Sequence, residues 1–171
     1  MRIKRGKEER QMEHTLTLRA AEEKDVGVVL SLIRELAEYE KMSDQVIATE
    51  EGLRAAMFDR RVAEAIIAEE DGKLIGFALY FYNFSTFIGH EGLYLEDLYV
   101  RPEYRGRGYG KALFCALARR AKEKNCGRFE WSCLDWNTPS IGFYRSMGAV
   151  AMDEWTVYRL DRAGIDALVK N

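Results

Sequence analysis

Apolar and polar residues follow two different periods along the N-terminal third of the chain. Residues 15–21 alternate between apolar and polar, which predicts a strand. Residues 25–40 carry apolar side chains every three or four positions, which predicts a helix with one buried face. A shorter helix is predicted over residues 49–58, with Thr49 as its N-cap.

The remaining pattern predicts three strands, followed by a helix, a strand, a helix and a last strand. Residues 62–70 and 73–82 flank Asp71-Gly72, a dipeptide that favours a tight hairpin. A strand over residues 93–100 and a helix over residues 108–125 follow. The last predicted elements are a strand over 128–134, a helix over 138–148 and a strand over 154–160. This order predicts an α/β (α+β) protein whose central sheet is mixed, mostly antiparallel and flanked by helices.

Length and composition narrow the classes of protein. A chain of 171 residues is expected to form one domain, here residues 15–171, with residues 1–14 as a disordered N-terminal extension. The balance of 26 basic and 28 acidic residues argues against a nucleic-acid binder. No apolar run approaches the ~18 residues of a membrane span. Three cysteines without close spacing argue against a zinc site or disulfide framework and favour the cytoplasm.

The strand over residues 93–100 contains two adjacent acids, Glu96 and Asp97. Strict alternation places them on opposite faces, each among apolar side chains. Burying a carboxylate is costly unless it is paired or hydrogen-bonded, so these positions require an explanation. For Glu96 a functional role and a structural carboxylate are both open. For Asp97 the favoured interpretation is structural, with catalysis as the alternative.

A glycine-rich turn, "RGRGYG", joins this strand to the following helix. Its glycines fall at every second position, which excludes the spacing of a P-loop and of a dinucleotide-binding fingerprint. Converging backbone N–H groups at a helix N-terminus nevertheless suit a phosphate, and Arg105, Arg107 and Lys111 add positive charge. A tight turn with solvated arginines is the alternative.

Four longer motifs are more specific than the turn alone. The strings "LIRELAEYEKMSDQV", "LYLEDLYVRPEYRGRGYG", "LDWN" and "FYRSMGA" occur in this order. Together they resemble the GNAT superfamily of N-acetyltransferases, and within it the diamine acetyltransferase branch of spermidine/spermine and thialysine enzymes. The resemblance covers about residues 15–160 and implies the GNAT acyl-CoA N-acyltransferase fold, acetyl-CoA as co-substrate and no metal.

The resemblance implies roles for individual residues. Glu96 matches the base that deprotonates the amine, commonly through water, and Tyr144 matches the acid that protonates the CoA thiolate; a core aromatic is the alternative for Tyr144. The implied cofactor-binding residues are Leu98, Tyr99, Val100, Arg105, Gly106, Arg107, Gly108, Tyr109, Gly110, Lys111, Asn137, Thr138, Pro139 and Ser140. The implied substrate-binding residues are Tyr39, Glu40, Glu96, Glu130, Trp131 and Ser132.

One departure from the polyamine-type members bears on the substrate. Ser85 stands where those members tend to carry an aspartate. A contact for a long polycation is then missing, which favours a shorter amine such as a lysine analogue or a small diamine. The resemblance also implies a homodimer, while the charge balance and the lack of a long apolar run favour neither nucleic acid nor a membrane as a partner. Cys133 is interpreted as a packing residue because no base accompanies it.

Elementary chemistry agrees with these roles. An alkylammonium has a pKa of ~10.4, so a nearby carboxylate must attract the cation and then accept its proton. A phenol, with a pKa of ~10, donates a hydrogen bond to a developing thiolate. The sequence therefore predicts direct acetyl transfer in a ternary complex. Two alternatives stay open: a CoA-binding regulatory or partner-binding module without turnover, and an acetyltransferase for protein lysines or N-termini.

Overall fold

The computed structural model describes residues 15–170. These residues belong to two compact units, one ending at Ser132 and the other beginning at Cys133. Each unit is described by itself below. The predicted extension over residues 1–14 lies outside the described residues, and the prediction of a single domain stays a prediction.

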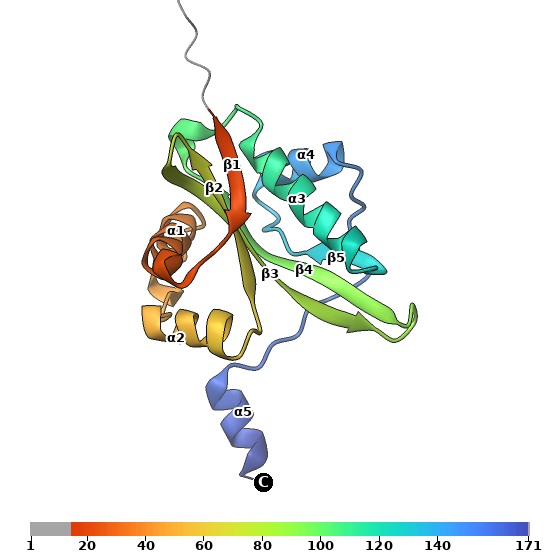
Figure 1. The fold of residues 1–171 in the computed structure, drawn as a ribbon. Coiled ribbons are helices and arrows are strands. Elements are labelled where there is room, and N and C mark those ends of the chain that lie inside the picture. Colours follow the sequence, from red (N-terminus) through yellow and green to blue (C-terminus); the bar gives the residue numbers. More distant parts are fainter. Residues whose placement is uncertain (1–14, 171) are drawn as a thin grey trace, which may run out of the picture. The chain divides into compact units, whose positions relative to one another are not determined.

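The first unit is built around one five-stranded sheet (Figure 1). Its strands follow one another in chain order: β1 (Leu16–Ala20), β2 (Glu64–Glu70), β3 (Lys73–Ser85), β4 (His90–Val100) and β5 (Arg128–Trp131). The pairs from β1 to β4 are antiparallel, and β4 and β5 are parallel. The predicted mixed, mostly antiparallel sheet is confirmed.

Helices cover both faces of this sheet (Figure 1). Helix α1 (Val26–Tyr39) and the shorter α2 (Glu50–Arg54), which continues as a π-helical turn over Ala55–Asp59, lie on one side. Helix α3 (Tyr109–Glu123) lies on the other side. The predicted cap at Thr49 is confirmed, since its side chain accepts a hydrogen bond from the Gly52 N–H at 3.1 Å.

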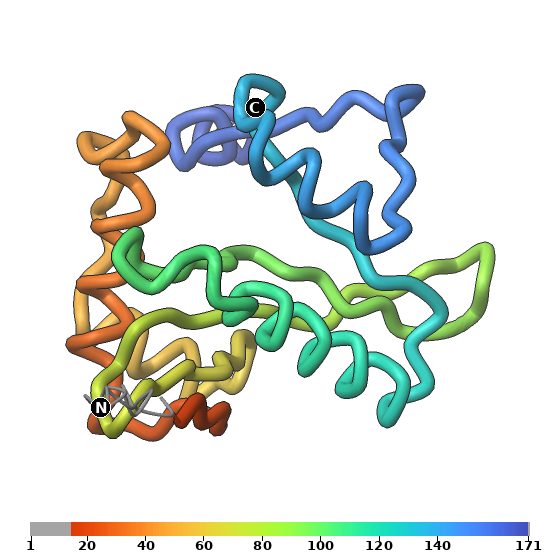
Figure 2. The backbone as a smooth tube through the Cα atoms, turned by 90° about the horizontal axis from the view of Figure 1, so that it is seen from above, coloured from red at the N-terminus to blue at the C-terminus, as the bar shows by residue number. Residues whose placement is uncertain are grey.

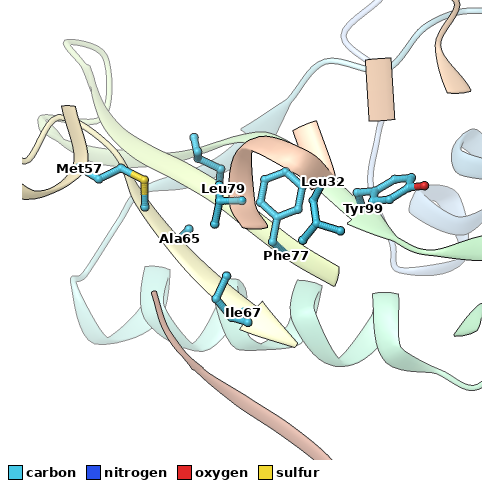
Figure 3. Close-up of a cluster of buried hydrophobic side chains, with 8 residues drawn as sticks. Leu32, Met57, Ala65, Ile67, Phe77, Leu79 and Tyr99 are labelled. Atoms are coloured by element: carbon cyan, nitrogen blue, oxygen red, sulfur yellow. The ribbon is translucent and has the colours of Figure 1, made fainter. Parts of the chain in front are cut away.

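The core on the α1 side explains the periodicity of the sequence. Its buried members come from α1, the π-helical turn and three strands: Val29, Leu32, Met57, Ala65, Ile67, Phe77, Leu79 and Tyr99 (Figure 3). Alternate residues of β2 and β3 point into it, as expected for strands with one face toward a helix. Removing a large side chain here costs about 2–5 kcal/mol in comparable cores.

The predicted hairpin at Asp71-Gly72 is confirmed. Both residues have positive φ angles, 51° and 79°, which is the backbone of the tight turns that match strand twist. β2 and β3 pair directly on either side of it, from Glu70 opposite Lys73 onward.

The prediction of strict alternation along residues 93–100 is wrong at Glu96. Leu79 of β3 lies opposite Asp97, but the next residue, Tyr80, lies opposite Leu95. Glu96 is therefore the extra residue of a β-bulge, which reverses the alternation on its two sides. Leu95 faces the α3 side with Tyr80, whereas Asp97 faces the α1 side with Leu79, because directly paired residues share a face.

The described part of the second unit consists of a turn, two helices and an irregular segment between them. Helix α4 (Thr138–Ser146) has Asn137 as its N-cap, and α5 (Arg162–Val169) has Asp161, whose side chain accepts from the Gly164 N–H at 2.8 Å. The predicted helix over 138–148 is confirmed.

The strand predicted over residues 154–160 is wrong. The segment is irregular in the described structure, although its sequence has the alternation of a strand. A strand is stabilised by ladder hydrogen bonds to a neighbour, and no described strand pairs with this segment. Its large apolar side chains are mostly exposed, including those of Trp155 and Val157.

Candidate active site

The turn between β4 and α3 has the geometry of an anion cradle. Gly106 and Gly108 adopt left-handed backbone angles, with φ of 77° and 83°, and Gly108 is the N-cap of α3. A Cβ placed at Gly106, Gly108 or Gly110 would meet no heavy atom within 4 Å. The first N–H groups of α3 have no partners within the helix and carry its partial positive charge. These residues fit a pyrophosphate.

Arg105 links this turn to β4 and to the end of α1. The backbone of the turn lies beside that end of α1 (Figure 2). Its Nε donates to the Val100 carbonyl oxygen at 2.8 Å. Its guanidinium lies over the rings of Tyr39 and Tyr99, with 4.9 Å and 5.4 Å to the two centroids. The side chain of Arg105 thus contacts two predicted cofactor-binding residues, Val100 and Tyr99, and one predicted substrate-binding residue, Tyr39.

Arg107 and Tyr109 are both bound by Glu70, at the end of β2. The Arg107 Nη1 lies 2.9 Å and 3.2 Å from the two carboxylate oxygens of Glu70. The Tyr109 hydroxyl donates to the same carboxylate, which raises the pKa of that phenol. The exposed side chain of Lys111, by contrast, forms no ion pair with any residue of 15–170.

The edge of β4 beyond the bulge lacks a strand neighbour within the first unit. β5 pairs only with Gly92 to Leu95 of β4, although β4 continues to Val100. On that side the described part of the first unit offers no ladder partner to Leu98, Tyr99 and Val100. Such an edge presents backbone N–H and C=O groups that suit an extended, amide-containing chain.

The two acids of β4 differ in their surroundings. Glu96 is exposed, so the prediction that it lies buried among apolar side chains is wrong, because the bulge turns its position outward. Asp97 is half-buried. Burial, with smaller contributions from the carboxylates of Glu96 and Glu40, raises the pKa of Asp97 to about 7. The structure thus gives Asp97 the surroundings of a proton acceptor near neutral pH.

The end of α1 brings a third acid to this place. Burial raises the pKa of Glu40, the residue that follows the last turn of α1. Among the residues that the structure describes, no basic side chain forms an ion pair with Glu40, Glu96 or Asp97. We call these three residues the acid cluster. A cluster of carboxylates without a cation is electrostatically suited to a cationic ligand.

The predicted substrate residues in β5 and directly after it contact neighbouring side chains. The Glu130 carboxylate lies 2.9 Å from Nε of Arg128. The Trp131 ring packs against Phe114 and Phe129, with centroids 5.0 Å and 5.1 Å away. The Ser132 hydroxyl and the Tyr94 hydroxyl lie 2.8 Å apart.

The remaining predicted residues lie in the second unit. Asn137 is buried, and its side-chain oxygen accepts from the Ser140 N–H at 3.3 Å. Thr138 and Pro139 form the first turn of α4, and Tyr144 lies half-buried in its last turn. Asn137 therefore has at least a capping role.

Two residues at this site were not predicted from the sequence to be functional. Strict alternation favours a structural role for Asp97 because it separates Asp97 from Glu96, and a bulge has no reliable signal in one sequence. Glu70 has no local signal of function, because its partners lie 37 and 39 positions further along the chain. Within residues 15–170, no group of His, Cys, Asp and Glu side chains is arranged to hold a metal ion, and no helix could cross a membrane.

Comparison with known proteins identifies the family of this chain. The Acetyltransferase (GNAT) family matches residues 30–149. A thialysine N-epsilon-acetyltransferase of Sus scrofa is 41% identical, over 86% of this chain and 93% of its own length. An L-ornithine N5-acetyltransferase of Arabidopsis thaliana is 29% identical, over 90% and 87%. The structure of an integron cassette protein from the mobile metagenome of V. cholerae superimposes with a TM-score of 0.77 and 28% identity, covering 91% of this chain and 98% of that one.

Proposed function

We propose that this chain, which belongs to the GNAT family of acetyltransferases, moves the acetyl group of acetyl-CoA to the side-chain amine of a lysine-like amino acid. That it is an acetyl-CoA-dependent N-acetyltransferase follows from the family and from relatives named as acetyltransferases. The nature of the amine, the acting residues and the order of events are the proposal.

The acid cluster is the observation that carries the choice of substrate. Three carboxylates without a cationic partner in the described structure lie where α1 ends above β4. A primary ammonium group supplies the missing charge. Thialysine and ornithine, the substrates named for two relatives, both carry a primary amine on a short side chain.

Ser85 supports a short amine rather than a long polyamine. It is buried, and its hydroxyl accepts from the Ile88 N–H at 3.4 Å within the turn after β3. The hydroxyl is thereby used by the turn, and it carries no charge for a second ammonium group. We propose that this enzyme distinguishes amino acids with one side-chain amine from spermine at this place.

Glu96 and Asp97 together prepare the amine. The ammonium loses its proton to Glu96, directly or through one water, while Asp97 stabilises the cation before the transfer. The free amine forms a bond to the acetyl carbon, the bond from that carbon to sulfur breaks, and the nitrogen releases its second proton to water, which leaves a neutral amide. The electrons of the broken bond stay on sulfur, the Tyr144 hydroxyl gives the thiolate its proton, and the Tyr144 phenolate regains a proton from water. No covalent bond to the enzyme forms, so proximity supplies much of the rate.

The binding roles follow the geometry of each element. The open edge of β4 at Leu98, Tyr99 and Val100 receives the pantetheine amides, and the backbone from Arg105 to Lys111 receives the pyrophosphate. We propose two further sets of binding residues: one in the second unit that lines the CoA channel, and one that surrounds the substrate amine. The CoA channel includes Asn137, Thr138, Pro139 and Ser140; the amine site includes Tyr39, Glu40, Glu130, Trp131 and Ser132.

A panel of amines tests the proposed substrate class. Release of CoA from acetyl-CoA is followed with thialysine, lysine, ornithine, putrescine, spermidine, spermine, an aminoglycoside and a lysine-containing peptide. We expect the highest kcat/KM for one of the three amino acids. A tenfold preference for spermine would contradict the inference from Ser85, and a preference for the peptide would favour a protein acetyltransferase.

Tyr144→Phe tests turnover separately from binding. We expect kcat to fall about 10²-fold or more, because the thiolate then leaves without a proton donor, while the affinity for CoA stays within twofold. Phe143→Leu, at the preceding position of α4, is the control for packing. If no amine reacts although CoA binds, the chain is a CoA-binding regulatory module and the enzymatic proposal fails.

We also propose a homodimer in the cytoplasm. Residues 150–169 expose a series of large apolar side chains: Val150, Met152, Trp155, Val157, Tyr158, Leu160, Ile165, Leu168 and Val169. Burial of this surface against a second copy would stabilise an assembly. Sedimentation of the intact chain, with a chain ending at Ala149 as comparison, measures the assembly state. A monomeric intact chain at micromolar concentration contradicts the proposal.

A further inference from the structure

Glu70 is a buried acid at the end of β2, outside the residues assigned to the reaction. It is 7% exposed. A carboxylate at such a depth destabilises a fold unless charge and hydrogen bonds compensate it. Two compensating groups come from the glycine-rich turn, since Arg107 supplies a positive charge and Tyr109 supplies a hydroxyl.

These two partners flank the residue that starts α3. Arg107 precedes Gly108 and Tyr109 follows it, so one carboxylate fixes both neighbours of the helix cap. Arg107 also donates from Nη2 to the Glu103 carbonyl oxygen at 3.3 Å, which ties the turn to the residues before it. The position of the first N–H groups of α3 therefore depends on Glu70.

Odd-numbered and even-numbered positions of the sequence "RGRGYG" have different roles. Arg105, Arg107 and Tyr109 are bound by groups of the protein itself. The glycines between them leave open space beside the backbone. In this arrangement the backbone N–H groups are offered to an anion, while the guanidinium of Arg107 is neutralised by Glu70.

We propose that Glu70 is a positioning residue, which holds the turn in its anion-binding shape through Arg107 and Tyr109. Arg107 then serves the shape of the turn and does not bind phosphate itself. This inference rests on the proposed function, because it takes CoA as the anion that the turn receives.

The competing role for Arg107 predicts an effect of opposite sign. If Arg107 binds the pyrophosphate, Glu70 competes with the ligand for it, and removal of the Glu70 charge strengthens CoA binding. If Glu70 positions the turn, its removal weakens CoA binding, because the backbone N–H groups lose their alignment and Arg107 loses its restraint.

The experiment measures CoA affinity by calorimetry for the full chain and for Glu70→Gln and Glu70→Ala. We expect the dissociation constant to rise about tenfold for Glu70→Ala and less for Glu70→Gln, which keeps a hydrogen-bond acceptor. Glu69→Gln is the matched control, because Glu69 is the neighbouring residue of β2 and pairs with Arg19 at 2.7 Å, away from the turn. Its CoA affinity is expected to stay within twofold.

A truncated co-substrate separates positioning from a general loss of structure. Acetyl-pantetheine has no pyrophosphate, so kcat/KM for it is expected to stay within threefold in the Glu70 variants, while kcat/KM for acetyl-CoA falls about tenfold. A merely structural role would lower both values together.

Arg107 and Tyr109 variants complete the test. We expect Arg107→Ala combined with Glu70→Ala to weaken CoA binding no more than either change alone, since both remove the same restraint. If Glu70→Ala does not fold, as judged by circular dichroism, Glu70→Gln and Tyr109→Phe carry the comparison, each with an expected loss of threefold or more. Unchanged or tighter CoA binding in the folded variants would overturn the inference. An unmodified chain that binds no CoA would instead overturn the proposed function, and the inference with it.

Discussion

The glycine-rich turn and the acid cluster differ in whether their charged side chains have partners within the protein. In the turn, Arg107 is matched by Glu70, and Arg105 lies against a carbonyl oxygen and two aromatic rings. In the acid cluster, Glu40, Glu96 and Asp97 have no cationic partner among the described residues. Both regions lie in the first unit. The turn follows β4, and two members of the acid cluster, Glu96 and Asp97, lie in β4.

The difference shows which charges are available to a ligand. In the glycine-rich turn, charges that are paired within the protein fix the conformation of the backbone, and a ligand then contacts backbone N–H groups. Charges that are left unmatched raise the free energy of the empty site and lower it when a cation binds. We infer that the turn recognises its ligand through shape and that the acid cluster recognises its ligand through charge.

The largest expected effect is the loss of catalysis on removing charge from the acid cluster. Glu96→Gln combined with Asp97→Asn is expected to lower kcat/KM for the best amine about 10³-fold or more, and each single change about 10²-fold. Glu91→Gln, an exposed acid on the same strand, is the control. Steady-state kinetics at pH 8 measure the effect, and a loss of less than tenfold in the double variant would exclude the cluster from the reaction.

The second effect is a pH dependence that comes from Asp97. Its pKa of about 7 lies above the ordinary value of an aspartate, so the folded chain holds this proton more tightly than the unfolded chain. The free energy of unfolding therefore decreases as pH rises from about 4 to about 7, and it stays reduced above pH 7. Asp97→Asn is expected to be roughly 1–3 kcal/mol more stable than the unmodified chain at pH 8 and equally stable near pH 4.

Urea denaturation at the two pH values measures this difference. The same linkage applies to the ligand, because a bound ammonium favours the ionised form of Asp97. Amine affinity is accordingly expected to increase between pH 6 and 8 in the unmodified chain. Equal stability of Asp97→Asn and the unmodified chain at pH 8 would contradict the raised pKa of Asp97.

The third effect concerns the shape of the turn. Gly108→Ala forces a side chain onto a backbone with φ of 83°, which costs about 1–2 kcal/mol whatever the free space beside it. We expect the affinity for CoA to fall about tenfold. We expect the free energy of unfolding to fall by about 1–2 kcal/mol. Gly142→Ala, at a helical position of α4, is the control and is expected to stabilise the chain by about 0.5–1 kcal/mol. An unchanged CoA affinity in Gly108→Ala would refute recognition by shape.

The smallest expected effect comes from Lys111. Its exposed side chain forms no ion pair with residues 15–170, so its charge acts on a ligand from a distance. Lys111→Gln is expected to weaken CoA binding about twofold to threefold at low salt, and not at all in 1 M salt, where the charge is screened. Lys122→Gln, near the other end of α3, is the control. A tenfold loss that persists in high salt would show a direct contact.

Local features of this fold were predictable from the sequence. The Asp71-Gly72 turn, the Thr49 cap and the glycine before α3 each depend on two to four neighbouring residues. The central sheet followed from the order of these elements. The motifs that resemble the GNAT family also predicted a cofactor site at the glycine-rich turn, and the structure shows open space beside the glycines of that turn.

Features that depend on distant residues were not predictable. The bulge at Glu96 arises from the pairing of β4 with β3, and it moved Asp97 to the side of α1. The pairing of Glu70 with Arg107 joins positions 37 residues apart. The segment over 154–160 has the period of a strand, but a strand also needs a partner, and periodicity carries no information on where that partner lies.

One calorimetric comparison tests the central claim that charge selects the amine and shape selects CoA. CoA and thialysine are titrated separately into the unmodified chain and into Glu96→Gln combined with Asp97→Asn, at pH 8, the second titration with CoA present. We predict that thialysine affinity falls at least 30-fold in the double variant while CoA affinity changes less than twofold. Thialysine binding of equal strength in both chains would contradict the account.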